Sequence, residues 1–276
     1  MSPLPADAPI GVFDSGMGGL TVLRALMNAL PAEEFLYLGD TARLPYGTKS
    51  PATVERYALQ AGGHLVRRGV KCLVVACNTA SAAALPAMQR KFAPLIVVGV
   101  VEPGAAAAVA ATRSGRIGVL ATESTVRGGA YQRALAVLRP DVEVVAVAAT
   151  VFVALAEEGW VDGAIAAAVA HRYLAPLYAA DGPRPDTLVL GCTHFPPLAA
   201  VIAREAGEDV TVVDSAATTA AVLRQQLLAA GLGRNAPATA VRFLVTDGAE
   251  RFQRIGPAFL GAAIARDQIE TVDLGG

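Results

Sequence analysis

Two cysteines in matching sequence contexts are the residues of this chain best suited to chemistry. The segments are LVVACNT at residues 73–79, around Cys77, and LVLGCTH at residues 188–194, around Cys192. Each apolar, β-branched run predicts a buried strand, and the small polar residues after it predict a turn. Open α/β sheets bind ligands at the carboxyl ends of their strands. The pattern therefore predicts one pocket with a sulfur on either side.

Three other interpretations of the cysteines stay open at this stage. A disulfide is disfavoured, because residues 1–7 lack the basic start and apolar region of a signal peptide, and thiols stay reduced in the cytoplasm that we therefore expect. A metal site lacks Cys-x-x-Cys spacing. Buried structural thiols are common, and Cys72, without polar companions, fits that interpretation. Cys77 and Cys192 fit it less well, because hydrogen-bonding side chains follow both.

Composition limits the classes of partner. At 276 residues the chain is long enough for two domains. A formal net charge of -1 argues against a nucleic-acid partner, and an aromatic content of 5% argues against base stacking. No apolar stretch is long enough to span a membrane. We expect a compact soluble protein.

The organisation of the chain repeats faintly. An Ile-Gly-Val strand start occurs at residues 10–12 and again at 117–119, and each leads on to one of the two cysteine motifs. Alternating strands and helices predict parallel sheets. We expect an α/β fold with two facing, doubly wound, pseudo-symmetric domains and the site in the cleft between them. The predicted domains are residues 1–98 plus 211–276, and residues 99–210.

The remaining elements follow from periodicity and turn signals. Strands are expected at residues 35–40, 97–101, 142–147 and 210–215. Helices are expected at residues 20–30, 51–69 and 216–230. The segment Glu102-Pro103-Gly104 is expected to end the strand before it. The tail beyond residue 243 is expected to pack on the first domain.

Polar residues at two other strand ends are candidate site residues. The Asp14-Ser15 turn, rich in glycine, can hold an anion or simply cap a helix. Its glycine spacing lacks the dinucleotide fingerprint, so a nucleotide cofactor is rejected. Residues 40–47 form a second loop dense in hydrogen-bonding groups, with Tyr46 either in the site or packed on the surface. His194 lies close to Cys192 and could tune the pKa of its thiol.

Four segments in order resemble the signatures of the glutamate racemase family. They are VFDSGMGGL at residues 12–20, YLGDTARLPYG at 37–47, ACNTAS at 76–81 and GCTHFP at 191–196. The resemblance runs from about residue 10 to 215. The chain departs from the family pattern ahead of Glu157-Glu158-Gly159, where Ala149-Thr150 and Ala154 replace a Cys-Pro pair and a second Pro. No role is therefore transferred to Glu157 or Glu158.

The resemblance implies a cofactor-independent isomerase that interconverts L- and D-glutamate without pyridoxal phosphate or a metal. It also implies that the D-glutamate is used to synthesise peptidoglycan, the cell-wall polymer that maintains cell shape. Inversion at Cα needs an acid/base group on each face, and two thiols near their usual pKa suit that task. Similarity assigns the catalytic roles to Cys77 and Cys192, with Asp14 assisting the first and His194 the second. It also implies a homodimer. The substrate-binding residues it implies are Asp14, Ser15, Tyr46, Gly47, Asn78, Thr79, Thr122, Thr193 and His194.

Other functions remain as alternatives. A racemase for aspartate or another amino acid could use the same two-thiol scaffold, with the size of the pocket around the distal carboxylate deciding the substrate. A decarboxylase with one thiol is disfavoured because both cysteines are present. A non-catalytic amino-acid-binding module of the periplasmic type is opposed by the paired thiols and by the expected cytoplasmic location.

Overall fold

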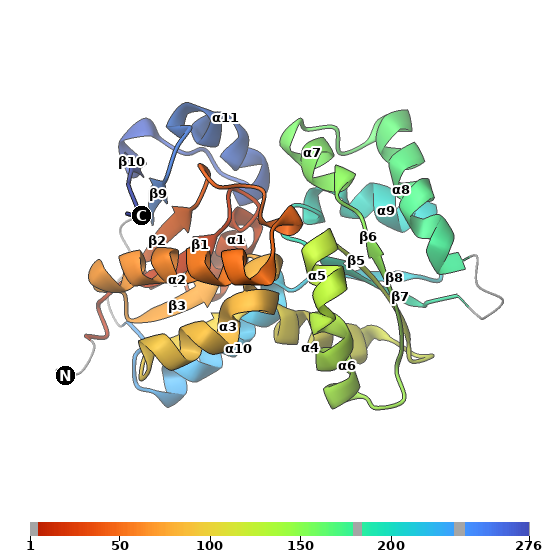
Figure 1. Ribbon diagram of the computed structural model, residues 1–276, viewed down its shortest axis with the longest axis horizontal. Helices are drawn as coiled ribbons and strands as arrows, with labels where there is room; N and C mark the ends of the chain where they lie inside the picture. Colours follow the sequence, from red (N-terminus) through yellow and green to blue (C-terminus); the bar gives the residue numbers. More distant parts are fainter. Residues whose placement is uncertain (1–4, 179–183, 235–240, 276) are drawn as a thin grey trace.

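The chain folds into two parallel β-sheets that lie side by side, each with helices against it (Figure 1). The computed structural model describes residues 5–178, 184–234 and 241–275. The six-stranded sheet has the order β10-β9-β2-β1-β3-β4 and the four-stranded sheet the order β6-β5-β7-β8. We call each sheet with its helices the first half and the second half. The expected α/β fold with two parallel sheets is confirmed.

The strands of the first sheet come from both ends of the chain, as expected for the tail. They are β1 (Ile10–Asp14), β2 (Phe35–Gly39), β3 (Cys72–Val75), β4 (Ile96–Gly99), β9 (Val241–Val245) and β10 (Ile269–Thr271). The strands of the second sheet are β5 (Arg116–Ala121), β6 (Glu143–Ala148), β7 (Thr187–Gly191) and β8 (Thr211–Val213). Strands β1, β3 and β7 are buried along their whole length, which matches their continuous apolar sequences.

Helices connect the strands and cover both sheets. The helices of the first half are α1 (Leu20–Ala29), α2 (Pro51–Arg67), α3 (Asn78–Phe92), α10 (Ala216–Ala229) and α11 (Ala249–Leu260). Those of the second half are α4 (Val101–Ala111), α5 (Glu123–Gly128), α6 (Ala130–Leu138), α7 (Val151–Glu157), α8 (Gly163–Tyr178) and α9 (Ala199–Ala206). Helix α1 packs on α10 and α11, α2 packs on α3, and α8 packs on α9. Among the described residues, no helix combines the length and the hydropathy that crossing a membrane requires.

Strand register brings the two cysteine turns to comparable positions in their sheets. Ile10 pairs with Cys72 in the first sheet, so β1 and β3 end together and the turns after them meet at one edge. Ile117 pairs with Thr187 in the second sheet, so β5 and β7 also end together. The largest apolar core contains residues of both sheets, and it ties the two halves to each other.

Two expectations about the chain differ from the structure. The boundary expected after residue 210 leaves β8 in the first domain, whereas β8 pairs in parallel with β7 in the second sheet. This strand is short and partly exposed, so its sequence carries little sign of the sheet that it joins. The segment Glu102-Pro103-Gly104 does not end a strand but lies in the first turn of α4. Proline is tolerated there because first-turn amides have no partner within the helix.

Candidate active site

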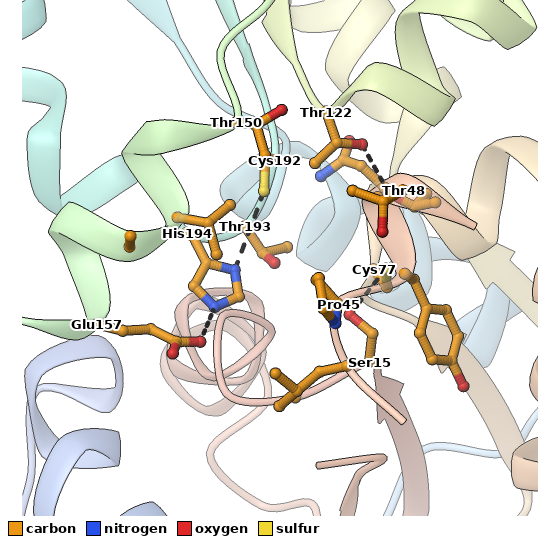
Figure 2. Close-up of a pocket in the computed structure, with 18 residues that line it drawn as sticks. Ser15, Pro45, Thr48, Cys77, Thr122, Thr150, Glu157, Cys192, Thr193 and His194 are labelled. Atoms are coloured by element: carbon orange, nitrogen blue, oxygen red, sulfur yellow. Dashed lines mark hydrogen bonds and ion pairs between the residues drawn. The ribbon is translucent and has the colours of Figure 1, made fainter. Parts of the chain in front are cut away.

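The carboxyl ends of the two sheets share one cavity of about 260 Å³. It is lined from the first half by Ser15, Gly16, Leu44, Pro45, Tyr46, Gly47, Thr48, Cys77, Asn78 and Thr79. It is lined from the second half by Thr122, Thr150, Val153, Ala154, Glu157, Cys192, Thr193 and His194. Every site residue expected from the sequence therefore lines the cavity except Asp14. Figure 2 shows Cys192 beside His194 on one side and Cys77 beside Ser15 on another.

Cys77 occupies the N-terminal cap of helix α3. Its Sγ accepts a hydrogen bond from the Ala80 backbone amide at 3.4 Å, and its thiol donates to Ser15 Oγ, also at 3.4 Å. Burial raises the pKa of the Cys77 thiol to about 12, and the negative charge of Asp14 adds to this effect, while the bonds to Ser15 and Ala80 oppose it. The Cys77 thiol is therefore protonated at neutral pH. A thiolate formed there would lie at the positive end of the helix dipole.

Cys192 lies at the end of a chain of charged side chains. Its Sγ is 4.0 Å from Nδ1 of His194, and the other ring nitrogen of His194 is 3.0 Å from Oε1 of Glu157. Oε2 of Glu157 accepts a hydrogen bond of 2.8 Å from Arg251, which belongs to α11 of the first half. Burial lowers the pKa of His194, but its bonds to Cys192 and Glu157 outweigh that effect and raise the pKa to about 10. His194 is therefore a cation at neutral pH, held beside the sulfur.

Asp14 is fully buried behind the glycine-rich turn and does not line the cavity. Its Oδ2 accepts a hydrogen bond of 2.8 Å from the Gly16 backbone amide, and Thr193 Oγ1 approaches its Oδ1 at 3.5 Å. Burial raises the pKa of Asp14, against the lowering effects of His194 and the neighbouring amides. The carboxylate of Asp14 thus accepts hydrogen bonds from backbone amides of its own turn. The turn is therefore not an open anion site.

Comparison with known proteins agrees with this geometry. The family model for Asp/Glu/hydantoin racemases matches residues 10–223. The chain belongs to this racemase family. It is 51% identical to a glutamate racemase of Geobacter metallireducens over 256 residues, which is 92% of this chain and 93% of that protein. It is 47% identical to a glutamate racemase of Neisseria meningitidis over 278 residues, with both chains covered completely.

Solved structures of family members superpose closely on this racemase. Glutamate racemase RacE1 of Bacillus anthracis is 38% identical, with a TM-score of 0.90 over 97% of this chain and 98% of that chain. The glutamate racemase of Francisella tularensis, solved in complex with D-glutamate, is 35% identical, with a TM-score of 0.90 over 98% of both chains. These similarities confirm the two-sheet architecture of the racemase fold.

Glycines allow the two halves of this racemase to approach each other at the cavity. A Cβ atom on Gly18 would overlap the ring of His194. A Cβ atom on Gly47 would lie 2.7 Å from the Cβ of Thr122. In both places a residue of the first half touches one of the second without a side chain between them. The glycine spacing of the first turn thus serves close packing against His194.

The hydroxyl of Tyr46 is hydrogen-bonded to a residue of its own loop. The Tyr46 hydroxyl donates to Oδ2 of the buried Asp40, which also accepts a 2.7 Å bond from Arg43. Tyr46 therefore lines the cavity with its hydroxyl held by Asp40. Hydroxyl groups meet elsewhere, since Oγ1 of Thr79 lies 2.9 Å from Oγ1 of Thr122 in the other half.

Helix α7 contributes site residues that the sequence analysis did not assign. Thr150, Val153, Ala154 and Glu157 line the cavity. The Glu-Glu-Gly segment that begins at the last residue of α7 was visible as a family feature, but only the structure shows that Glu157 contacts His194. Within the described parts of the chain, no group of three or more His, Cys, Asp or Glu side chains could hold a metal ion.

Proposed function

We propose that this racemase interconverts L- and D-glutamate by moving the Cα proton directly between the substrate and two thiols, those of Cys77 and Cys192. The observation that carries the proposal is that these two sulfurs come from different halves and line one cavity. Glutamate as substrate is supported by the names of the relatives, including the Francisella tularensis protein solved with D-glutamate. A cofactor-independent reaction is part of the proposal and is supported by the family resemblance.

The chemistry requires one acid/base group on each face of Cα. In one direction a thiolate removes the Cα proton and becomes a thiol, and the thiol on the opposite face donates its proton to the carbanion and becomes a thiolate. Atoms and charge balance, and the enzyme ends with its two protonation states exchanged. A single group would return the proton mostly to the face that it left. Exclusion of water from the closed cavity would protect the carbanion from protonation on the wrong face.

The two thiols have different means of support. Cys77 has the N-terminus of α3 and the backbone amide of Ala80 at 3.4 Å. Cys192 has the imidazolium of His194, which could return a proton to that sulfur or stabilise its charge. Asp14 lies outside the cavity lining, and its negative charge raises the pKa of Cys77 and that of His194. We assign Asp14 and His194 the role of tuning the two proton transfers.

Neutral donors would hold the substrate zwitterion. Of the described residues around the cavity, none is Lys or Arg. Ser15, Asn78, Thr79 and Thr193 supply hydroxyl and amide groups instead. Such groups can bind carboxylates and an ammonium group without a dominant cation. We further propose, from the family resemblance, a cytoplasmic homodimer that supplies D-glutamate for peptidoglycan synthesis.

The proposal is tested with a panel of L-amino acids and the purified protein, dialysed against a chelator and supplied with no cofactor. L-Glutamate should lose its optical rotation, and L-aspartate, L-glutamine and L-alanine should change far more slowly. Faster racemisation of aspartate would replace the substrate in the proposal. Failure to racemise any member of the panel, with glutamate binding intact, would favour a binding module.

A first expected result concerns the ion pair between His194 and Glu157. Glu157→Gln removes the negative charge 3.0 Å from the imidazole, so the pKa of His194 should fall below its native value of about 10. Because His194 then loses its proton at lower pH, the alkaline limb of kcat/KM should also move to lower pH. An NMR titration can follow the imidazole directly, since the chain has only three histidines.

Glu158→Gln is the matched control, because Glu158 is exposed and does not line the cavity. Unchanged titration of His194 in Glu157→Gln would contradict the assignment.

A further inference from the structure

Tyr131 is a buried residue of α6 that lies behind the cavity wall and does not line it. Its hydroxyl donates a 2.7 Å hydrogen bond to Oδ1 of Asn78. Its ring occupies a tight slot, since a Cβ atom on Gly191 would lie 3.0 Å from the ring and one on Gly104 would lie 2.9 Å from the hydroxyl. Gly191 directly precedes Cys192. The ring is therefore packed against the same strand end that carries one thiol, and the hydroxyl lies beside Gly104 of α4.

Asn78 has one end of its amide satisfied and the other end free. It is the first residue of α3, it is 2% exposed, and it lines the cavity directly after Cys77. Its Oδ1 accepts from Tyr131, while its Nδ2 is buried and has no hydrogen-bond partner. A buried, unpaired N–H donor is unfavourable unless a ligand accepts from it. The unpaired donor thus marks where a substrate acceptor belongs.

We propose that Tyr131 is a positioning residue that fixes the orientation of the Asn78 amide, so that Nδ2 donates to a carboxylate oxygen of the substrate. The two ends of an asparagine amide have nearly the same shape, so hydrogen bonds decide which end faces the cavity. Tyr131 belongs to the second half and Asn78 to the first, so the amide is oriented only when the halves are together. The inference rests on the proposed function, which supplies the carboxylate substrate.

Tyr131→Phe is the first test, because it removes only the hydroxyl. Without that donor the Asn78 amide can rotate and present its oxygen to the substrate carboxylate. The KM for glutamate should rise by about tenfold, the effect of losing one hydrogen bond to a charged group, with a much smaller change in kcat. Tyr178→Phe is the matched control, since its hydroxyl donates to the Ala206 carbonyl at 3.3 Å within the second half, away from the cavity. An unchanged KM in Tyr131→Phe would overturn the inference while leaving glutamate racemisation by the unsubstituted protein intact.

Asn78→Asp tests the orientation even if Tyr131→Phe fails to fold. Aspartate keeps an oxygen for the Tyr131 hydroxyl and replaces the Nδ2 donor by a negatively charged oxygen. The inference predicts a higher KM for glutamate, because two carboxylates would then face each other. An unchanged or lower KM would mean that an oxygen of residue 78 faces the substrate ammonium group, and the inference would be wrong.

A double-mutant cycle separates positioning from general packing. If Tyr131 acts through the Asn78 amide, adding Tyr131→Phe to Asn78→Ala should change KM little further. A full additional tenfold loss would show that Tyr131 acts through another contact, such as its packing on Gly191, and would overturn the inference. Absence of glutamate racemisation by the unsubstituted protein would instead refute the proposed function, and the inference with it.

Discussion

Replacing either Cys77 or Cys192 by alanine should abolish racemisation of glutamate in both directions. In the proposed mechanism each direction needs one sulfur to remove the proton and the other to deliver it, so neither direction should survive the loss of one thiol. The loss should be at least about 10⁴-fold, the upper end of a typical general acid–base contribution. Both sulfurs are small groups at the cavity wall, so the fold and glutamate binding should persist. Racemisation assays and calorimetric titration with D-glutamate measure the two effects separately.

Cys72→Ala is the control for this pair. Cys72 is fully buried in β3, and burial raises the pKa of its thiol to about 12. It does not line the cavity, so this substitution should affect core packing and leave the rate of racemisation near that of the unsubstituted protein. Near-normal turnover in Cys77→Ala or Cys192→Ala would end the two-thiol interpretation.

Substitution of Asp14 and His194 should slow racemisation by about 10²- to 10⁴-fold, with opposite bias between the two directions. Asp14→Asn removes the negative charge that raises the pKa of the Cys77 thiol, so the Cys77 thiolate becomes a weaker base and should remove the proton more slowly. His194→Asn removes the cation beside Cys192 and should impair proton removal by that sulfur. The two enantiomers have equal free energy in water, so kcat/KM must fall equally in both directions. The bias should therefore appear in kcat and in the isotope effect with Cα-deuterated glutamate. That effect should increase in the direction whose proton removal is impaired.

The bias distinguishes tuning of a thiol from binding of substrate. Asp14 does not line the cavity, and His194 does so beside Cys192. A residue that only binds substrate would affect both enantiomers alike. Equal changes in kcat and equal isotope effects in the two directions, for both variants, would assign Asp14 and His194 to binding instead.

The cavity could be anticipated from the sequence because its framework is local. Strand, small residue and polar turn are adjacent in the chain at Cys77 and at Cys192, and parallel strands bring such turns to one edge of a sheet. The residues of the turns at Cys77 and Cys192 could therefore be expected to line a common cavity. The α/β fold with two parallel sheets followed from the alternation of strands and helices.

Interactions between distant segments could not be anticipated in the same way. Glu157 meets His194 and Arg251 only because α7 and α11 come together across the two halves. Tyr131 of the second half likewise donates a hydrogen bond to Asn78 of the first. Nothing in the local sequence distinguishes these side chains from surface or core residues. The short strand β8 likewise joins its sheet through pairing with β7 rather than through a pattern of its own.

A two-thiol mechanism places a separate acid/base group on each face of Cα. The most direct test is to incubate L-glutamate with the enzyme in heavy water, stop the reaction at low conversion, separate the enantiomers and measure deuterium at Cα by mass spectrometry. The two-thiol mechanism predicts that the D-glutamate formed carries deuterium from the solvent, while the remaining L-glutamate keeps its original proton. D-Glutamate that retains the original proton, or remaining L-glutamate that gains deuterium as fast as product forms, would show a single shared base and contradict the account.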